Sequence, residues 1–245
     1  HKGQYDSRLV AVKVCGENFL GFDMTEFTRE VAIMSIVRHK NVLHCFGANT
    51  SDRNELLIVT EWIPNGSLRN LIADSSVEMT WPMRLSLAIQ IAKGMEFLHS
   101  LHIIHCDLKS DNIMLAENLA VKIIDFGASR TATDETTTVL GTTQWLAPEV
   151  FSHNGRATSA ADVYAFGVIL WELLTRELPW EGTVTYAIPD LVLAGKRPRI
   201  PKQFANTKYA NLITACWQGH ASKRPTFSQI IQDLKALGEE HHLYL

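Results

Sequence analysis

The chain contains the polar run His105-Cys106-Asp107-Leu108-Lys109-Ser110-Asp111-Asn112, which lies between two apolar segments. On one side, apolar residues three and four positions apart predict a helix over 81–99, with Pro82 in its first turn. On the other side, the run continues directly into Ile113-Met114-Leu115. Polar side chains enclosed by core elements need partners or a chemical role. The run is therefore the first candidate for a functional segment.

A second polar motif, Asp125-Phe126-Gly127, follows a predicted strand over Val121–Ile124. If Asn112 and Asp125 converge, they offer an amide oxygen and a carboxylate. Such ligands suit Mg²⁺, which binds proteins through one or two carboxylates together with substrate phosphates. The two motifs together predict a site for a phosphate-bearing ligand and its metal ion.

Glu30 is the feature of the N-terminal quarter that a simple core cannot explain. On a helix at 100° per residue, it shares a face with four apolar residues, and a buried carboxylate without a partner is costly. The candidate partner is Lys13, which alternation places on one strand face with Ala11. A solvated lysine near a strand end is the alternative for Lys13. The four apolar residues around Glu30 are Phe27, Ile33, Met34 and Val37.

Composition excludes several classes of protein. The 245 residues carry a net charge of −3, which does not favour nucleic acid or an anionic membrane surface as the main partner. The four cysteines contain no Cys-x-x-Cys pair, so they suit a reducing compartment and not a disulfide framework. No apolar stretch is long enough to span a bilayer. The chain opens on His1, so we expect it to be a piece of a longer protein.

The character of the sequence changes near residue 66. Short β-branched runs over Leu9–Val14 and Leu56–Thr60 precede it, and helical patterns follow it. The segment 163–174 is apolar on every side, which predicts a helix buried inside a lobe. A capping box, Thr226-x-x-Gln229, predicts the start of a last helix, and Gly238 predicts its end. The pattern favours an α+β fold.

With these motifs in this order, the sequence resembles the eukaryotic protein kinase domain over almost the whole chain. The motifs are Val10-Ala11-Val12-Lys13, Glu30, the run 105–112, Asp125-Phe126-Gly127, Ala147-Pro148-Glu149, Asp162 and Arg224. The resemblance implies a two-lobed fold over 1–245: a small β-rich N-lobe at 1–60, a hinge at 61–66 and a larger, mainly α-helical C-lobe at 67–245. It also implies that Arg224 pairs with Glu149.

The resemblance assigns roles to particular residues. Asp107 accepts the proton of the substrate hydroxyl, Lys109 neutralises the transferred phosphoryl, and Asn112 and Asp125 hold Mg²⁺. Lys13, braced by Glu30, grips the α- and β-phosphates of ATP. The remaining nucleotide contacts implied are Ala11 and Met114 on the two faces of adenine, Thr60 at the gatekeeper position, and the Glu61 carbonyl and Ile63 amide at the adenine edge. Met34, Cys45, His105 and Phe126 correspond to a spine between the lobes.

The activity implied is ATP-dependent phosphorylation of protein substrates in cytoplasmic signalling. Lys109, and Gly141-Thr142 ahead of Trp145, are similar to serine/threonine kinases; Thr142 would touch Asp107 and Lys109. Gly-Ser-Leu at 66–68, Asp-Leu-Lys-Ser at 107–110 and Trp-Leu-Ala-Pro-Glu at 145–149 resemble the tyrosine-kinase-like group. A kinase-shaped binding module without catalysis is the alternative, and the presence of Lys13, Asp107 and Asp125 argues against it.

The sequence departs from the family in two places. None of its 14 glycines forms a Gly-x-Gly pair, so the Gly-rich phosphate loop is absent. We expect the loop to lie before His1, with the N-lobe truncated at its start; the alternative is a protein that lacks the loop. Cys106 stands where most kinases have Arg, a partner for phosphate on the activation segment. Possible phosphorylation sites there are Thr131, Thr133, Thr136, Thr137 and Thr138. A zinc site at His99, His102 and His105 is disfavoured, because these residues straddle a helix end.

Overall fold

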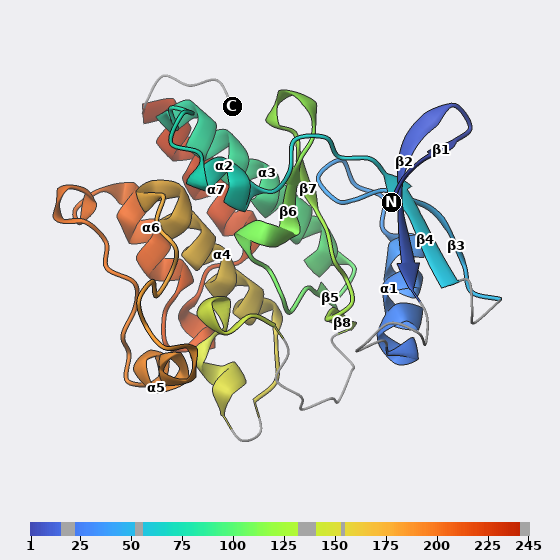
Figure 1. Ribbon diagram of the computed structural model, residues 1–245. Coiled ribbons are helices and arrows are strands. Elements are labelled where there is room, and N and C mark those ends of the chain that lie inside the picture. Colours follow the sequence, from blue (N-terminus) through green and yellow to red (C-terminus); the bar gives the residue numbers. More distant parts are fainter. Residues whose placement is uncertain (16–22, 52–55, 132–140, 153–154, 241–245) are drawn as a thin grey trace.

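A four-stranded antiparallel sheet and one helix form the smaller part of the molecule. The computed structural model describes residues 1–15, 23–51, 56–131, 141–152 and 155–240, and these divide into two parts of unequal size (Figure 1). The sheet has the strand order β1-β2-β4-β3. Helix α1 contacts β3. The bounds are β1 Lys2–Tyr5, β2 Arg8–Cys15, α1 Met24–Ile36, β3 Cys45–Asn49 and β4 Leu56–Glu61.

Helix α1 buries the face that the sequence predicts. Asp23 caps its start by accepting a hydrogen bond from the Thr25 amide at 2.7 Å. The buried residues of α1 are Phe27, Glu30, Ile33 and Met34, and Val37 is buried just after its end. Glu30 is thus enclosed among apolar side chains, as its position on the helix predicts.

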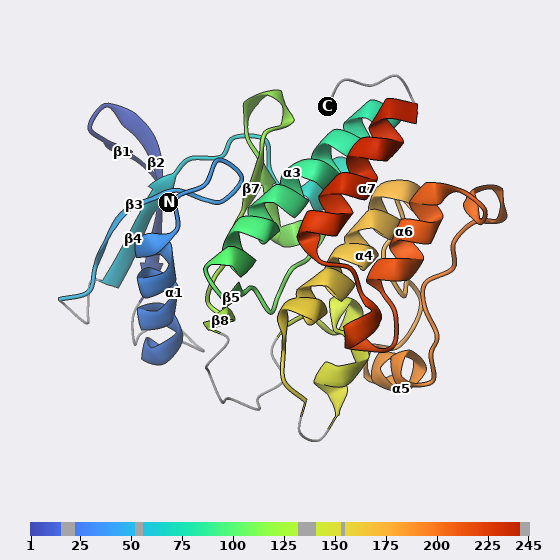
Figure 2. The same cartoon turned by 180° about the vertical axis from the view of Figure 1, so that it is seen from behind.

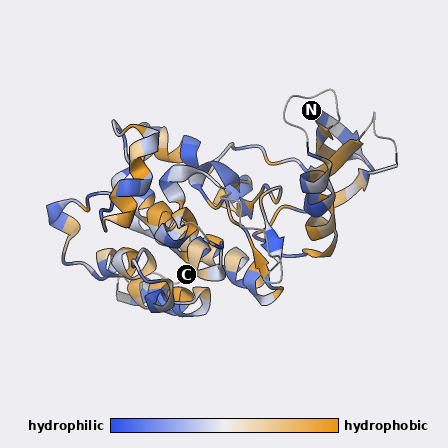
Figure 3. Cartoon of the chain, turned by 90° about the horizontal axis from the view of Figure 1, so that it is seen from below, coloured by the Kyte–Doolittle hydropathy of each residue, from blue (hydrophilic) through white to orange (hydrophobic). Residues whose placement is uncertain are grey.

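Helices dominate the larger part, and α4 lies at its centre. Every residue of α4 from Ala161 to Leu174 is buried, so the prediction of an enclosed helix is confirmed. Helices α3 and α7 lie side by side (Figure 2), and α4 packs against α3 and α6. Apolar and polar stretches lie side by side on the helices, as expected for helices that bury one face and expose the other (Figure 3). The helices are α2 Leu68–Ala73, α3 Trp81–Ser100, α4 Ser159–Thr175, α5 Ile188–Leu193, α6 Lys208–Cys216 and α7 Phe227–Glu240.

The capping box ahead of α7 is present, but the predicted end of this helix is wrong. Gln229 Oε1 accepts from the Thr226 amide at 2.8 Å, and the Gln229 amide donates to Thr226 Oγ1 at 3.3 Å. The helix then continues through Gly238 to Glu240. Leu234 and Leu237 are buried, and α7 packs along α3. This packing extends the helix past a residue whose weak helix propensity alone would end it.

Two short strand pairs join the two parts. The hairpin of β6 (Ile113–Leu115) and β7 (Val121–Ile123) lies between the sheet and the helices (Figures 1 and 2). β5 (Ile103–Ile104) pairs with β8 (Arg130–Thr131) nearby. The Ile123 amide donates to the Asn41 carbonyl at 2.9 Å, which links the hairpin to the segment between α1 and β3. β7 ends at Ile123, one residue before the predicted end, although the Ile124 amide still donates to the Asn112 carbonyl at 3.0 Å in the register of the hairpin.

Among the described residues, none of the helices is both long and apolar enough to cross a membrane.

Candidate active site

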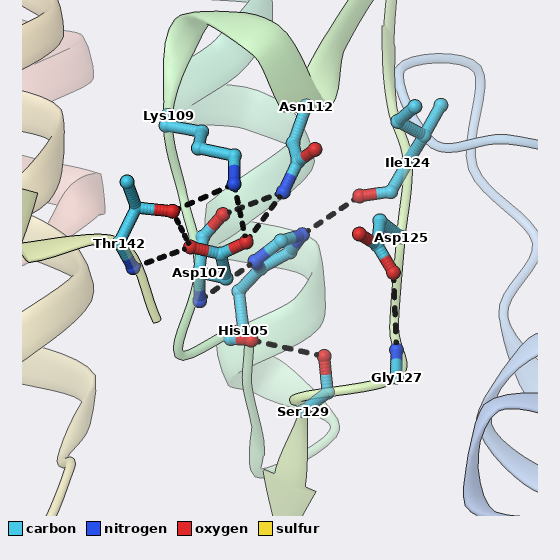
Figure 4. A network of polar contacts seen from close by, with 9 residues as sticks. All are labelled: His105, Asp107, Lys109, Asn112, Ile124, Asp125, Gly127, Ser129 and Thr142. Atoms are coloured by element: carbon cyan, nitrogen blue, oxygen red, sulfur yellow. Dashed lines mark hydrogen bonds and ion pairs between the residues drawn. The ribbon is translucent and has the colours of Figure 1, made fainter. Parts of the chain in front are cut away.

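The carboxylate of Asp107 is the centre of a polar network (Figure 4). Its Oδ1 accepts from both the amide and the hydroxyl of Thr142 at 2.8 Å. Its Oδ2 accepts from Lys109 Nζ at 2.8 Å and from Asn112 Nδ2 at 3.0 Å. The carboxylate is therefore oriented by donors from two chain segments, which makes it a fixed proton acceptor.

The residues around Asp107 also bind one another. Lys109 Nζ donates to Thr142 Oγ1 at 2.6 Å, so the predicted contacts of Thr142 with Asp107 and Lys109 are present. Asn112 Nδ2 donates in addition to the Asp107 carbonyl at 2.9 Å. Since the amide nitrogen of Asn112 is turned toward Asp107, its side-chain oxygen is directed away from it (Figure 4).

A buried aspartate in α4 holds the backbone of this loop. Asp162 accepts from the amides of His105 and Cys106 at 2.9 and 3.0 Å, and from His99 Nε2 at 2.8 Å. His105 Nε2 pairs with the Ile124 carbonyl at 3.0 Å. The two histidine rings thus have separate partners, and in the described part of the chain no three His, Cys, Asp or Glu residues gather as a metal cluster.

Asp125 follows β7 in a left-handed backbone conformation, with φ of 66°. Aspartate is among the few non-glycine residues that tolerate this region, because its side chain bonds locally. Here Asp125 Oδ1 accepts from the Gly127 amide at 3.4 Å. Phe126 is fully buried, and its ring lies 5.5 Å from that of His105. Asp125 itself is exposed while the neighbouring phenyl ring is enclosed, so its carboxylate remains accessible to a ligand.

Lys13 and Glu30 form the predicted ion pair, with Lys13 Nζ 2.7 and 2.9 Å from the two carboxylate oxygens. Glu30 is 6 % exposed. Burial acts to lower the pKa of Lys13, but the charge and hydrogen bonds of Glu30, together with the charge of Asp125, outweigh it and raise the pKa above its ordinary value. Lys13 is therefore held as a cation, and it interacts electrostatically with Asp125 as well as with Glu30.

The residues expected at the adenine lie on β4, on the segment after it and on neighbouring strands. Thr60 is buried and pairs in register with Ala11 across β2 and β4. The Glu61 carboxylate is occupied elsewhere, accepting from Lys122 Nζ at 2.7 Å and from the His44 amide at 2.8 Å. Ile63 is buried just beyond the strand. Both bonds engage Glu61 Oε1, and the Glu61 carbonyl accepts from Thr60 Oγ1 at 3.3 Å.

The other members of the expected site fall in two places. Met114 is half-buried on β6, where it forms a bridge with Ser67. Met34 and Cys45 belong to the same buried core as Phe126.

Sequence reasoning missed a buried carboxylate beneath the loop. Glu172 is fully buried in α4 and accepts from Ser110 Oγ at 2.7 Å, Trp145 Nε1 at 3.0 Å and an Arg69 guanidinium nitrogen at 3.4 Å. Burial raises the pKa of Glu172 to about 7, against the effect of these three donors. The signal available in the sequence was the one charged residue within the otherwise apolar segment 163–174.

The predicted pair of Arg224 and Glu149 is bidentate, with N–O distances of 2.6 and 2.7 Å. It ties the segment after Trp145 to the loop ahead of α7. The Arg224 side chain is fully buried, so the pair lies largely out of water.

Cys106 precedes Asp107 in the loop that Asp162 holds. It is buried with φ of 67°, and burial raises the pKa of its thiol. Of the expected phosphorylation sites, Thr131 lies on β8, and Thr133, Thr136, Thr137 and Thr138 lie outside the described residues.

The family model described as protein tyrosine and serine/threonine kinase matches residues 1–234 of this chain. The chain therefore belongs to this family, and its sheet-and-helix architecture is the two-lobed kinase fold.

Curated relatives agree with that assignment. The chain is 42 % identical over 239 residues to the RGS domain-containing serine/threonine-protein kinase A of Dictyostelium discoideum, covering 97 % of this chain and 21 % of the relative. It is 41 % identical to a probable LIM domain-containing serine/threonine-protein kinase of the same organism, covering 98 % and 37 %. It is 41 % identical to the serine/threonine-protein kinase STY46 of Arabidopsis thaliana, covering 98 % and 42 %.

These relatives agree with the tyrosine-kinase-like group expected from the sequence, and nothing in them favours a module without catalysis. The chain spans between about a fifth and two fifths of the length of the three relatives.

Proposed function

We propose that this domain transfers the γ-phosphoryl group of ATP to serine and threonine hydroxyls of protein substrates. The observation that carries the proposal is the network around Asp107, in which donors from Lys109, Asn112 and Thr142 orient one partly exposed carboxylate. The acceptor hydroxyl gives its proton to Asp107 as its oxygen bonds to the γ-phosphorus. The bond from that phosphorus to the bridging oxygen breaks, and ADP leaves.

The remaining residues of the network serve the same transfer. Lys109 neutralises charge on the phosphoryl group, and its bond to Thr142 supports the assignment because it sets the cation beside the proton acceptor. Lys13, kept cationic by Glu30, binds the α- and β-phosphates. Ala11 and Met114 pack against the two faces of adenine, and Thr60 is the gatekeeper. The Glu61 carbonyl and the Ile63 amide form hydrogen bonds with the adenine edge.

Asn112 and Asp125 are the residues that would hold Mg²⁺. The donor set fits this ion, because an amide oxygen directed away from Asp107 and a carboxylate are hard oxygen ligands, and phosphate oxygens complete the coordination. An ion held by these two residues would supply positive charge to neutralise the phosphates.

The acceptor class and the location belong to the same proposal. The relatives are named serine/threonine kinases, and Thr142 beside Asp107 suits a short hydroxyl side chain. A cytoplasmic location is supported by the four cysteines, all of which are free thiols.

The test is phosphorylation of a generic acceptor protein with ATP and Mg²⁺, followed by phosphoamino-acid analysis. We expect phosphoserine and phosphothreonine, and a loss of about 10²- to 10⁴-fold in Asp107→Asn or Asp125→Asn with unchanged thermal unfolding. Asp233→Asn, an exposed aspartate on α7, is the matched control and should keep full activity. Mainly phosphotyrosine would refute the acceptor class, and full activity in Asp107→Asn would refute the role of that residue.

A further inference from the structure

Glu172 joins two segments that meet at the proposed catalytic carboxylate. One of its oxygens accepts from Ser110, which follows Lys109 in the loop, at 2.7 Å. The other accepts from Trp145 at 3.0 Å, and Trp145 ends the short helical turn that begins right after Thr142. Both segments are therefore fastened to a single carboxylate on the central helix.

The same two segments meet again at Asp107, on the exposed side of the loop. Thr142 donates twice to one oxygen of Asp107, and Lys109 donates to the other oxygen and to Thr142. The two segments are thus connected by hydrogen bonds both at Asp107 and, beneath it, at Glu172. The distance between the Asp107 carboxylate and Thr142 depends on both sets of hydrogen bonds.

Burying the Glu172 carboxylate inside α4 is costly. We therefore expect Glu172 to have a role that an apolar residue could not fill. The Glu172 side chain is 0 % exposed, and α4 is otherwise apolar around it. Replacing a buried charged group by a well-packed apolar one is often neutral or stabilising. A leucine would fill the space but could not accept hydrogen bonds from two segments at once.

We propose that Glu172 is a positioning residue for the protein acceptor: by fastening Ser110 and Trp145 to α4, it holds Thr142 against Asp107 and so aligns the incoming hydroxyl. This inference rests on the proposed kinase function. The contacts proposed for adenine and for the α- and β-phosphates lie outside the two fastened segments, on β2, β4 and β6 and on the segment after β4. A defect at Glu172 should therefore affect the acceptor and leave the binding of these parts of ATP unaffected.

The test compares steady-state kinetics of Ser110→Ala and Trp145→Phe with the wild type. Each removes one hydrogen bond to Glu172 and retains most of its side chain. We expect kcat/KM for a protein acceptor to fall about tenfold in each, with a raised acceptor KM, an unchanged KM for ATP and unchanged hydrolysis of ATP by water. In the double variant the loss of kcat/KM should be smaller than the product of the two single losses. Removing either bond already frees one of the two segments from Glu172, so the second removal has less effect.

Glu172 itself is tested with a graded pair of variants. Glu172→Ala removes both bonds and should show the largest rise in acceptor KM. Glu172→Gln should recover much of it, because the amide oxygen accepts from Trp145 and the amide nitrogen donates to Ser110 Oγ. If Glu172→Ala does not fold, the Ser110 and Trp145 variants still decide the question.

Tyr209→Phe is the matched control for a merely structural effect. It removes another buried hydrogen bond to α4, from the Tyr209 hydroxyl to the Leu170 carbonyl at 3.2 Å, away from the loop. It should lower stability and move neither KM. An active wild type whose acceptor KM is unmoved in Ser110→Ala and Trp145→Phe would overturn this inference alone. A wild type that phosphorylates no protein would overturn the proposed function and this inference with it.

Discussion

Glu172→Gln should change how the stability of this domain depends on pH. In the folded protein, burial raises the pKa of Glu172 from 4.5 to about 7, and Arg69, 21 % exposed on α2, is the charged group facing it. At pH values between these two pKa values, Glu172 keeps its proton in the folded protein and has lost it in the unfolded chain. The free energy of unfolding contributed by this carboxyl is therefore fully present below pH 4.5 and is lost as the pH rises through about 7.

The magnitude follows from the shift. Because one pKa unit corresponds to a little over 1 kcal/mol, the full effect is about 3 kcal/mol, and most of it falls between pH 5 and 8. Glutamine does not titrate, so the difference between wild type and variant isolates this one group. The wild type should gain about 2–3 kcal/mol relative to Glu172→Gln when the pH is lowered from 8 to 5.

The assay is urea unfolding of both proteins across this pH range, with equal m-values as the check that the same surface is exposed. Tyr209→Phe is the control: burial raises the pKa of this phenol, so it stays protonated throughout, and its curve should run parallel to that of the wild type. Parallel curves for Glu172→Gln as well would refute the reasoning, since they would mean that Ser110, Trp145 and Arg69 fully compensate the burial.

Three further outcomes are expected. Glu149→Gln should cost about 3–5 kcal/mol, measured by urea unfolding, because it leaves the fully buried Arg224 guanidinium without its counter-charge; a cost below 1 kcal/mol would contradict this. Gly167→Ala should destabilise by about 1–3 kcal/mol despite the better helix propensity of alanine, since the added Cβ would lie 2.8 Å from Cys216 Cβ; a rise in the thermal midpoint would contradict it. Phosphatase treatment should lower kinase activity only modestly, because Cys106 lacks the charge that binds an activation-segment phosphate, and Cys106→Arg should enlarge the effect; a hundredfold loss in the wild type would refute the role of Cys106.

Much of the fold could be predicted because its signals are local. The apolar periodicity of 81–99, the wholly apolar 163–174 and the capping box at Thr226 each depend on residues within one or two helical turns. Glu30 could be matched with Lys13 because its place on the helix made a partner necessary. Gly238 shows where this reasoning fails: local propensity ends the helix there, and contact with α3 continues it.

The sequence by itself determined the family, the order of the motifs and the residues that meet at Asp107, since these are recognisable from residue type and spacing. Only the tertiary structure decided which groups share one carboxylate beneath that site. Ser110, Trp145 and Arg69 are far from Glu172 along the chain, and no periodicity links them. A buried charge in a sequence indicates that partners are needed, because an unpaired buried charge is costly. Which groups become the partners depends on how α4 packs against the loop, since every group that encloses the charge contributes to the cost of burial.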